Sequence, residues 1–68
     1  MTSREDGADF SDLVETLRGV SDELADRALG ILKEAHASGQ TRRPEEERVV
    51  TQARRSVEKA ISLLNRAG

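Results

Sequence analysis

The side chains best suited to chemistry in this sequence are a single histidine and a run of three glutamates. His36 lies two residues after Glu34, and Glu45, Glu46 and Glu47 are consecutive. A histidine acts as a general base or metal ligand only with an orienting partner or further ligands, and the sequence contains no second histidine and no cysteine. Successive helical residues differ by about 100° around the axis, so three adjacent glutamates cannot converge on one ion.

Both features have an ordinary structural explanation. A histidine near the C-terminus of a helix, and carboxylates in the first turn of one, each oppose the helix dipole. The sequence also lacks a glycine-rich phosphate loop and any recognisable nucleophile motif. We therefore predict no catalytic residue, no cofactor, no metal site and no enzymatic activity.

The basic residues of the C-terminal half form a second candidate group. Arg48, Arg55 and Lys59 fall opposite the apolar side of the last predicted helix, and Arg42 and Arg43 precede that helix. Such a stripe could contact phosphates or an acidic protein. Against nucleic acid stand a pI near 5.3 and a single aromatic residue, which leaves no platform for stacking bases. We favour a solvated helix face and keep a nucleic-acid-binding or transcription-associated regulator as the alternative function.

The composition is typical of a small helical protein. The 68 residues allow one domain, and chains of this size are marginally stable without reinforcement. Apolar and charged residues each make up 35% of the chain, a balance found in helical bundles. Because the sequence excludes disulfides and cysteine-based zinc sites, association is the reinforcement that remains.

The charge is divided unevenly along the chain. Residues 1–32 hold eight acids and three arginines, a balance of −5, whereas residues 33–68 hold eight bases and five acids, a balance of +3. The two halves can therefore attract each other, either within one chain or between two.

The N-terminus and the overall hydropathy indicate where the protein resides. Residues 1–8 are polar and aperiodic, so we expect a disordered leader rather than a secretory signal. No stretch approaches the roughly 20 apolar residues that span a bilayer. We expect a soluble, cytoplasmic protein that does not bind membranes.

The first helical region permits two interpretations. Asp9 or Ser11 could cap its start, and an apolar series at helical spacing then continues to about residue 37. In one interpretation a single helix contains Gly19, because an interior glycine costs only about 1 kcal/mol relative to alanine. In the other, which we favour narrowly, the chain breaks near Gly19 and Ser21, where a second cap-like sequence begins.

The next boundary is clearer. Gly39 suits the left-handed residue that ends a helix, and Pro44 followed by three glutamates is typical of a helix start. The predicted helices are thus about 9–19, 21–38 and 44–66, within a single helical domain of residues 9–68.

The last helix carries an apolar seam at 3-4 spacing, typical of helices that pack side by side. We predict an all-α fold: an antiparallel helical hairpin with a short N-terminal helix or extension, assembling as a dimeric helical bundle or coiled coil. A hairpin leaves apolar residues on its flanks that a second copy would cover. The residues predicted to carry assembly are Leu17, Leu24, Ala28, Ile31, Val50, Val57, Ile61 and Leu64. The expected function is a small protein–protein interaction or oligomerisation module, with a regulatory role.

Overall fold

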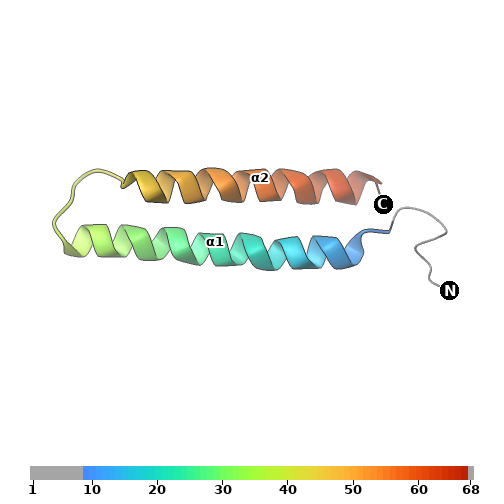
Figure 1. The fold of residues 1–68 in the computed structure, drawn as a ribbon, viewed down its shortest axis with the longest axis horizontal. Coiled ribbons are helices and arrows are strands. Elements are labelled where there is room, and N and C mark those ends of the chain that lie inside the picture. The colour runs from blue at the N-terminus through green and yellow to red at the C-terminus, as the bar shows by residue number, and fades with distance from the viewer. Residues whose placement is uncertain (1–8, 68) are drawn as a thin grey trace.

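The computed structural model describes residues 9–67, which form two antiparallel helices joined by one loop (Figure 1). Helix α1 spans Ser11–Ala37 and helix α2 spans Glu45–Ala67. The described residues contain no strand. The chain extends 56 × 17 × 11 Å along its principal axes, which is the shape of a flat rod. The predicted all-α hairpin is confirmed, while the predicted leader at 1–8 lies outside the described residues.

Helix α1 is continuous through Gly19 and Ser21, so the break predicted there is absent and the described residues form two helices rather than three. An added Cβ at Gly19 would meet nothing within 4 Å, so this glycine faces open space. Its cost in an uninterrupted helix is about 1 kcal/mol. Packing of the apolar stripe on both sides of Gly19 against α2 outweighs that cost.

Helix α1 begins without a standard N-cap, and Asp9 supplies the side-chain hydrogen bond at its start. The N-cap position is Phe10, which has no side-chain cap hydrogen bond. The Asp9 carboxylate accepts a hydrogen bond from the Ser11 backbone N–H at 3.1 Å, so of the two predicted caps Asp9 serves the helix start and Ser11 becomes its first residue.

The end of α1 confirms the prediction for Gly39, whose φ of +84° lies in the left-handed region. The backbone N–H of Gln40 donates to the Ala35 carbonyl and that of Gly39 donates to the His36 carbonyl, both at 3.0 Å. These two bonds form a Schellman motif, which satisfies carbonyls that the helix leaves unpaired. The chain then turns toward Pro44, whose carbonyl accepts the first helical bond of α2 from Arg48.

The core is a single line of contact between the helices. Only three apolar side chains of the described residues are buried, namely Val14, Ala35 and Ile61. The small side chains of Ala35 and Ser21 on α1 are also buried at this contact. Most other seam residues remain half-buried, because two helices cannot enclose a side chain on all sides.

Two glycines should respond oppositely to alanine. We expect Gly30→Ala to raise the free energy of unfolding by about 0.5–1 kcal/mol, because Gly30 is helical and its added methyl group meets open space. Gly39→Ala should lower the free energy of unfolding by about 1 kcal/mol, since alanine resists a positive φ. Urea unfolding followed by circular dichroism at one protein concentration measures both. A destabilising Gly30→Ala would show that α1 is not helical there.

Candidate interaction surface

The eight residues predicted to carry assembly all lie along the seam between α1 and α2. Ile61 is buried and the other seven are half-buried. These residues therefore take part in packing of α1 against α2 within one chain. Their remaining exposed area belongs to one long side of the hairpin. Of the eight, Leu17, Leu24, Ile31 and Leu64 lie toward that side.

One long side of the seam is polar and bonded across the helices. Ser21 of α1 is 1% exposed, and its hydroxyl donates to a Glu58 carboxylate oxygen at 2.5 Å. The Arg54 Nε–H donates to the same Ser21 oxygen at 3.1 Å. Ser21 thereby uses its hydroxyl as both donor and acceptor, and the three side chains fix how α1 and α2 align along their length.

Glu47 extends the polar side toward the loop. This residue is 4% exposed. Its carboxylate accepts hydrogen bonds from the Arg43 guanidinium and the Thr51 hydroxyl, each at 2.7 Å. The Thr51 hydrogen bond, then the hydrogen bond and charge of Arg43 and the charge of Arg48, lower the pKa of Glu47 against the opposing effect of burial. Glu47 is therefore an ionised structural group and more than a first-turn acid.

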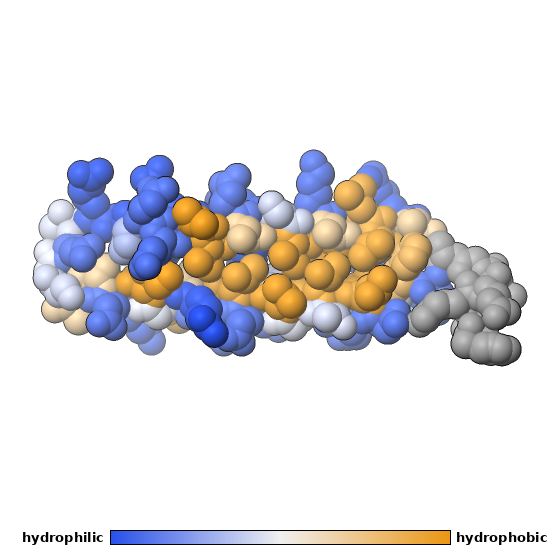
Figure 2. Space-filling model, in the orientation of Figure 1, coloured by the Kyte–Doolittle hydropathy of each residue, from blue (hydrophilic) through white to orange (hydrophobic). Residues whose placement is uncertain are grey.

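The opposite long side of the hairpin is apolar and uncovered. Figure 2 shows a continuous band of hydrophobic side chains along both helices, with charged side chains at its upper and lower borders. The large hydrophobic residues that are most exposed include Leu13 and Val20 of α1 and Val49 and Leu63 of α2, which are 41–57% exposed. We call this surface the apolar face. It comprises Leu13, Leu17, Val20, Leu24 and Ile31 of α1 with Val49, Ala53, Ala60, Leu63 and Leu64 of α2.

Helical geometry explains why the two sides differ. Residues 47, 51, 54 and 58 of α2 repeat at i, i+4, i+7 and i+11, which places one polar stripe along one side of that helix. Val49, Ala53, Ala60 and Leu64 repeat with similar spacing on the other side of the seam. On α1, Leu13 and Val20 lie seven residues apart on the apolar face. Leu29 follows Val20 by nine residues, which is about 180° around the helix, so it points elsewhere despite being 52% exposed.

The predicted basic residues are all exposed, yet two of them have carboxylate partners. Arg43 bonds Glu47, and the Arg48 guanidinium lies 3.7 Å from a Glu45 carboxylate oxygen. Arg55 and Lys59 lie on the outer surface of α2. Arg42 lies in the loop, apart from the stripe on α2.

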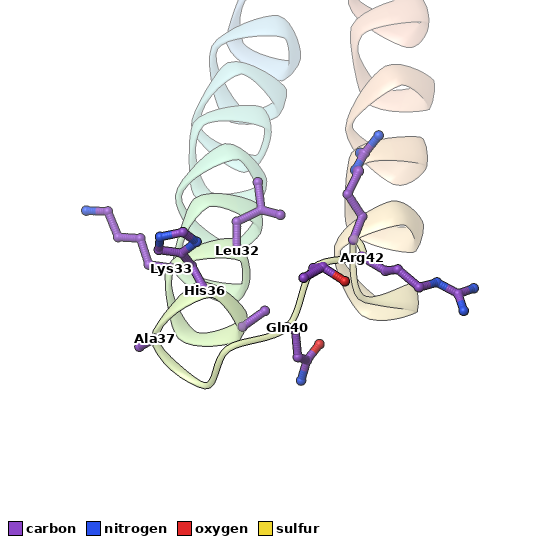
Figure 3. Close-up of a pocket in the computed structure, with 9 residues that line it drawn as sticks. Leu32, Lys33, His36, Ala37, Gln40 and Arg42 are labelled. Carbon is purple, nitrogen blue, oxygen red and sulfur yellow. The ribbon is translucent and has the colours of Figure 1, made fainter.

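A hollow of about 480 Å³ lies beside the loop, and its lining includes His36, Arg42 and Arg43. Figure 3 shows that Lys33 points outward on the far side of α1 from Arg42, with the His36 ring beside Lys33. Lys33 and Arg42 thus do not converge on a common point, so the hollow lacks the geometry of an anion site. Within residues 9–67 no group of three or more potential metal ligands comes together. No helix among them is both long and apolar enough to cross a membrane.

The comparisons with known proteins return nothing: no protein-family model, curated protein or solved structure matches the chain.

Sequence reasoning missed the polar side of the seam. In the sequence, Ser21 resembles a helix cap and Glu47 resembles a dipole-matching acid. The signal that was present is the polar residue Ser21 inside an otherwise apolar heptad series. A polar residue at a seam position indicates a buried hydrogen-bond partner on the facing helix.

Removal of the Ser21 hydroxyl tests the polar side. We expect Ser21→Ala to lower the free energy of unfolding by about 1 kcal/mol, because Arg54 and Glu58 lose their shared partner. Ser62→Ala is the matched control, since Ser62 is an exposed serine in α2 and reports helix propensity alone. Chemical unfolding of both variants measures the difference. Equal effects of the two substitutions would show that the Ser21 hydroxyl does not stabilise the packing of α1 on α2.

The lowered pKa of Glu47 makes stability depend on pH. Because the folded pKa lies below the unfolded one, ionised Glu47 contributes stability above the unfolded pKa, and this contribution is lost as pH falls through the folded pKa. We expect Glu47→Gln to be less stable than the wild type at neutral pH and the difference to shrink in acid. Thermal melting from pH 7 down to about pH 3 measures this. A difference that is constant over that range would contradict it.

Proposed function

We propose that this chain is a non-enzymatic protein–protein interaction and oligomerisation module, and that its apolar face packs against the apolar face of a second copy. The observation that carries the proposal is the one-sidedness of the hairpin. Polar bonds close one side of the seam, while the other side exposes large apolar residues from both helices. A contiguous exposed apolar surface of this extent marks an interaction site.

The size of the apolar face fits a stable dimer. Helix α2 has 23 residues, which at 1.5 Å per residue gives a length of about 35 Å. Two adjacent helices about 10 Å wide then present roughly 700 Å² in projection. A standard interface buries about 800 Å² on each partner, so one face-to-face contact supplies the area that a specific dimer needs.

The shape of the apolar face favours a helical partner of the same kind. Its α2 half includes Ala53 and Ala60, while its α1 half carries leucines and Ile31 at heptad spacing. Large side chains of one copy can thus pack into the space left by the small alanine side chains of the other. The face is flat and elongated, as the chain dimensions are, and a second hairpin has the same length and width. Face-to-face pairing produces a four-helix bundle.

Two variants with the same chemical change test the proposal. The melting temperature of the wild type should rise with protein concentration, because association stabilises only the folded chain. The double variant Val49→Lys/Leu63→Lys should lose this concentration dependence and melt at lower temperature, since lysine ammonium groups would be desolvated in the interface. The control Leu29→Lys changes an equally exposed apolar residue off the apolar face and should keep the concentration dependence.

Several outcomes would count against this function. If the wild-type melting temperature is the same over a hundredfold range of concentration, the second copy is not the occupant. If Leu29→Lys removes the concentration dependence as completely as the double variant does, association does not use the apolar face. In both cases, the alternative function, nucleic-acid binding through the basic stripe, is tested by measuring binding to a generic DNA duplex at low salt.

A further inference from the structure

A row of cations runs along the outer edge of α2. The row consists of Arg48, Arg55, Lys59 and Arg66, all of which are exposed. They are seven, four and seven residues apart, which keeps them within about 40° of one another around the helix. From its first to its last member the row is about 27 Å long, at 1.5 Å per residue. We call this row the basic edge.

The basic edge is turned away from the seam and from the apolar face. Arg55 is six residues before the buried Ile61 and Arg66 is five residues after it, so the two arginines point about 120° and 140° away from the seam. Arg55 also follows Thr51 of the polar side by four residues, which is a turn of about 40°. A second copy that covers the apolar face therefore leaves the basic edge free.

The glutamates of α2 leave most of the basic edge unneutralised. Glu47 and Glu58 accept hydrogen bonds from groups within the hairpin. Glu46 lines a hollow on the apolar side. Glu45 lies 3.7 Å from Arg48, but both side chains are exposed, so this pair is weak. The other three cations of the basic edge have no ion pair within residues 9–67.

The acids of α1 lie across the width of the hairpin from the basic edge. Glu15 and Asp26 are six residues before and five residues after the buried Ser21, which turns them about 120° and 140° away from the seam. Two helices side by side are about 20 Å wide, whereas salt screens charges over about 8 Å at physiological ionic strength. The acidic pI near 5.3 therefore describes the whole chain and not the electrostatic field at the basic edge.

The charge and length of the basic edge fit the phosphates of a DNA duplex. Three of its four cations are arginines, and a guanidinium group binds phosphate through two parallel hydrogen bonds. Its length of about 27 Å is a little less than one turn of duplex DNA, about 34 Å. Gln52 and Ser62 are exposed on either side of the row, where they can donate further hydrogen bonds to the backbone.

The scarcity of aromatic side chains favours a duplex over a single strand. Proteins that bind single strands stack exposed bases on aromatic rings, and Phe10 is the only aromatic residue of the chain. Contacts to the phosphates of a duplex need no such ring. They also keep ordered water in place, so the polar side of the hairpin is not stripped of its solvent.

We propose that the basic edge of α2 binds the phosphate backbone of duplex DNA without reading its base sequence. This binding activity goes beyond the proposed oligomerisation and uses no residue of the apolar face. In a dimer formed through the apolar faces, each copy keeps its own basic edge. Two edges in one particle then bind a long duplex more tightly than one edge does.

A lysine on each helix provides a matched test. Fluorescence anisotropy of a labelled duplex of about 20 base pairs, or two helical turns, measures the affinity and its dependence on salt. Four phosphate contacts predict a slope of about −3 to −4 for the logarithm of affinity against the logarithm of salt concentration. Lys59→Gln removes one contact, so the slope should become shallower by about one and binding at about 50 mM salt should weaken roughly tenfold. Lys33→Gln removes the same charge from an exposed position on α1 and should leave the slope unchanged.

Several outcomes would overturn the basic edge as a site for duplex DNA. These are the absence of binding at about 50 mM salt, and equal effects of Lys59→Gln and Lys33→Gln on the slope. Tighter binding to a single strand of the same sequence would show that the duplex is not the ligand. Displacement of the duplex by polyglutamate at equal charge concentration would assign the surface to an acidic protein instead.

DNA binding and dimerisation have separate readouts. Lys59→Gln should keep the helicity of the wild type and the dependence of its melting temperature on protein concentration, because Lys59 lies outside the apolar face. Loss of that dependence in Lys59→Gln would show that the basic edge belongs to the dimer interface, and the proposed DNA site would then be wrong. A chain that binds the duplex with the expected slope but melts independently of its concentration supports the DNA site and overturns only the oligomerisation.

Discussion

The structure depends on the fact that two helices touch along a line and therefore have no interior. Each seam residue meets the facing helix on one side and solvent on both flanks. This is why, among the apolar residues of the described range 9–67, only Val14, Ala35 and Ile61 are buried, although the apolar stripes are long and regular. The two flanks of this hairpin differ in chemistry. One flank is closed by hydrogen bonds and ion pairs, and the other exposes apolar surface.

The polar flank determines which surface is left for a partner. The Ser21 hydroxyl, held between Arg54 and Glu58, and the Glu47 carboxylate, held by Arg43 and Thr51, place charge along one side of the seam. A helix that packed over this flank would have to desolvate those groups, which is costly. The same bonds align α1 with α2. Packing within the chain and the choice of docking face thus follow from one polar network.

The helices themselves were predictable because their signals are local. Heptad spacing, the left-handed Gly39 and the turn before Pro44 each act over a few residues. Continuity through Gly19 was not predicted, because a cap-like sequence after a glycine looks like a start when the packing against α2 is unknown. The eight residues predicted to carry assembly are buried or half-buried in the hairpin, and their role in assembly stays a prediction. The roles of Ser21 and Glu47 were missed. The partners of Ser21 lie 33–37 residues away on the facing helix, and the burial of Glu47 depends on packing between the helices, which its local sequence does not reveal.

A hairpin with so little buried surface should be completed by a second copy, and a single dilution series can decide whether it is. Light-scattering mass and helical circular dichroism are recorded on the same samples. We expect a mass near twice 7.5 kDa at high concentration, with helical signal falling as the mass falls on dilution. A chain that keeps its full helical signal at a constant mass of 7.5 kDa would show that the hairpin is stable with its apolar face uncovered, and completion by a second copy would then be wrong.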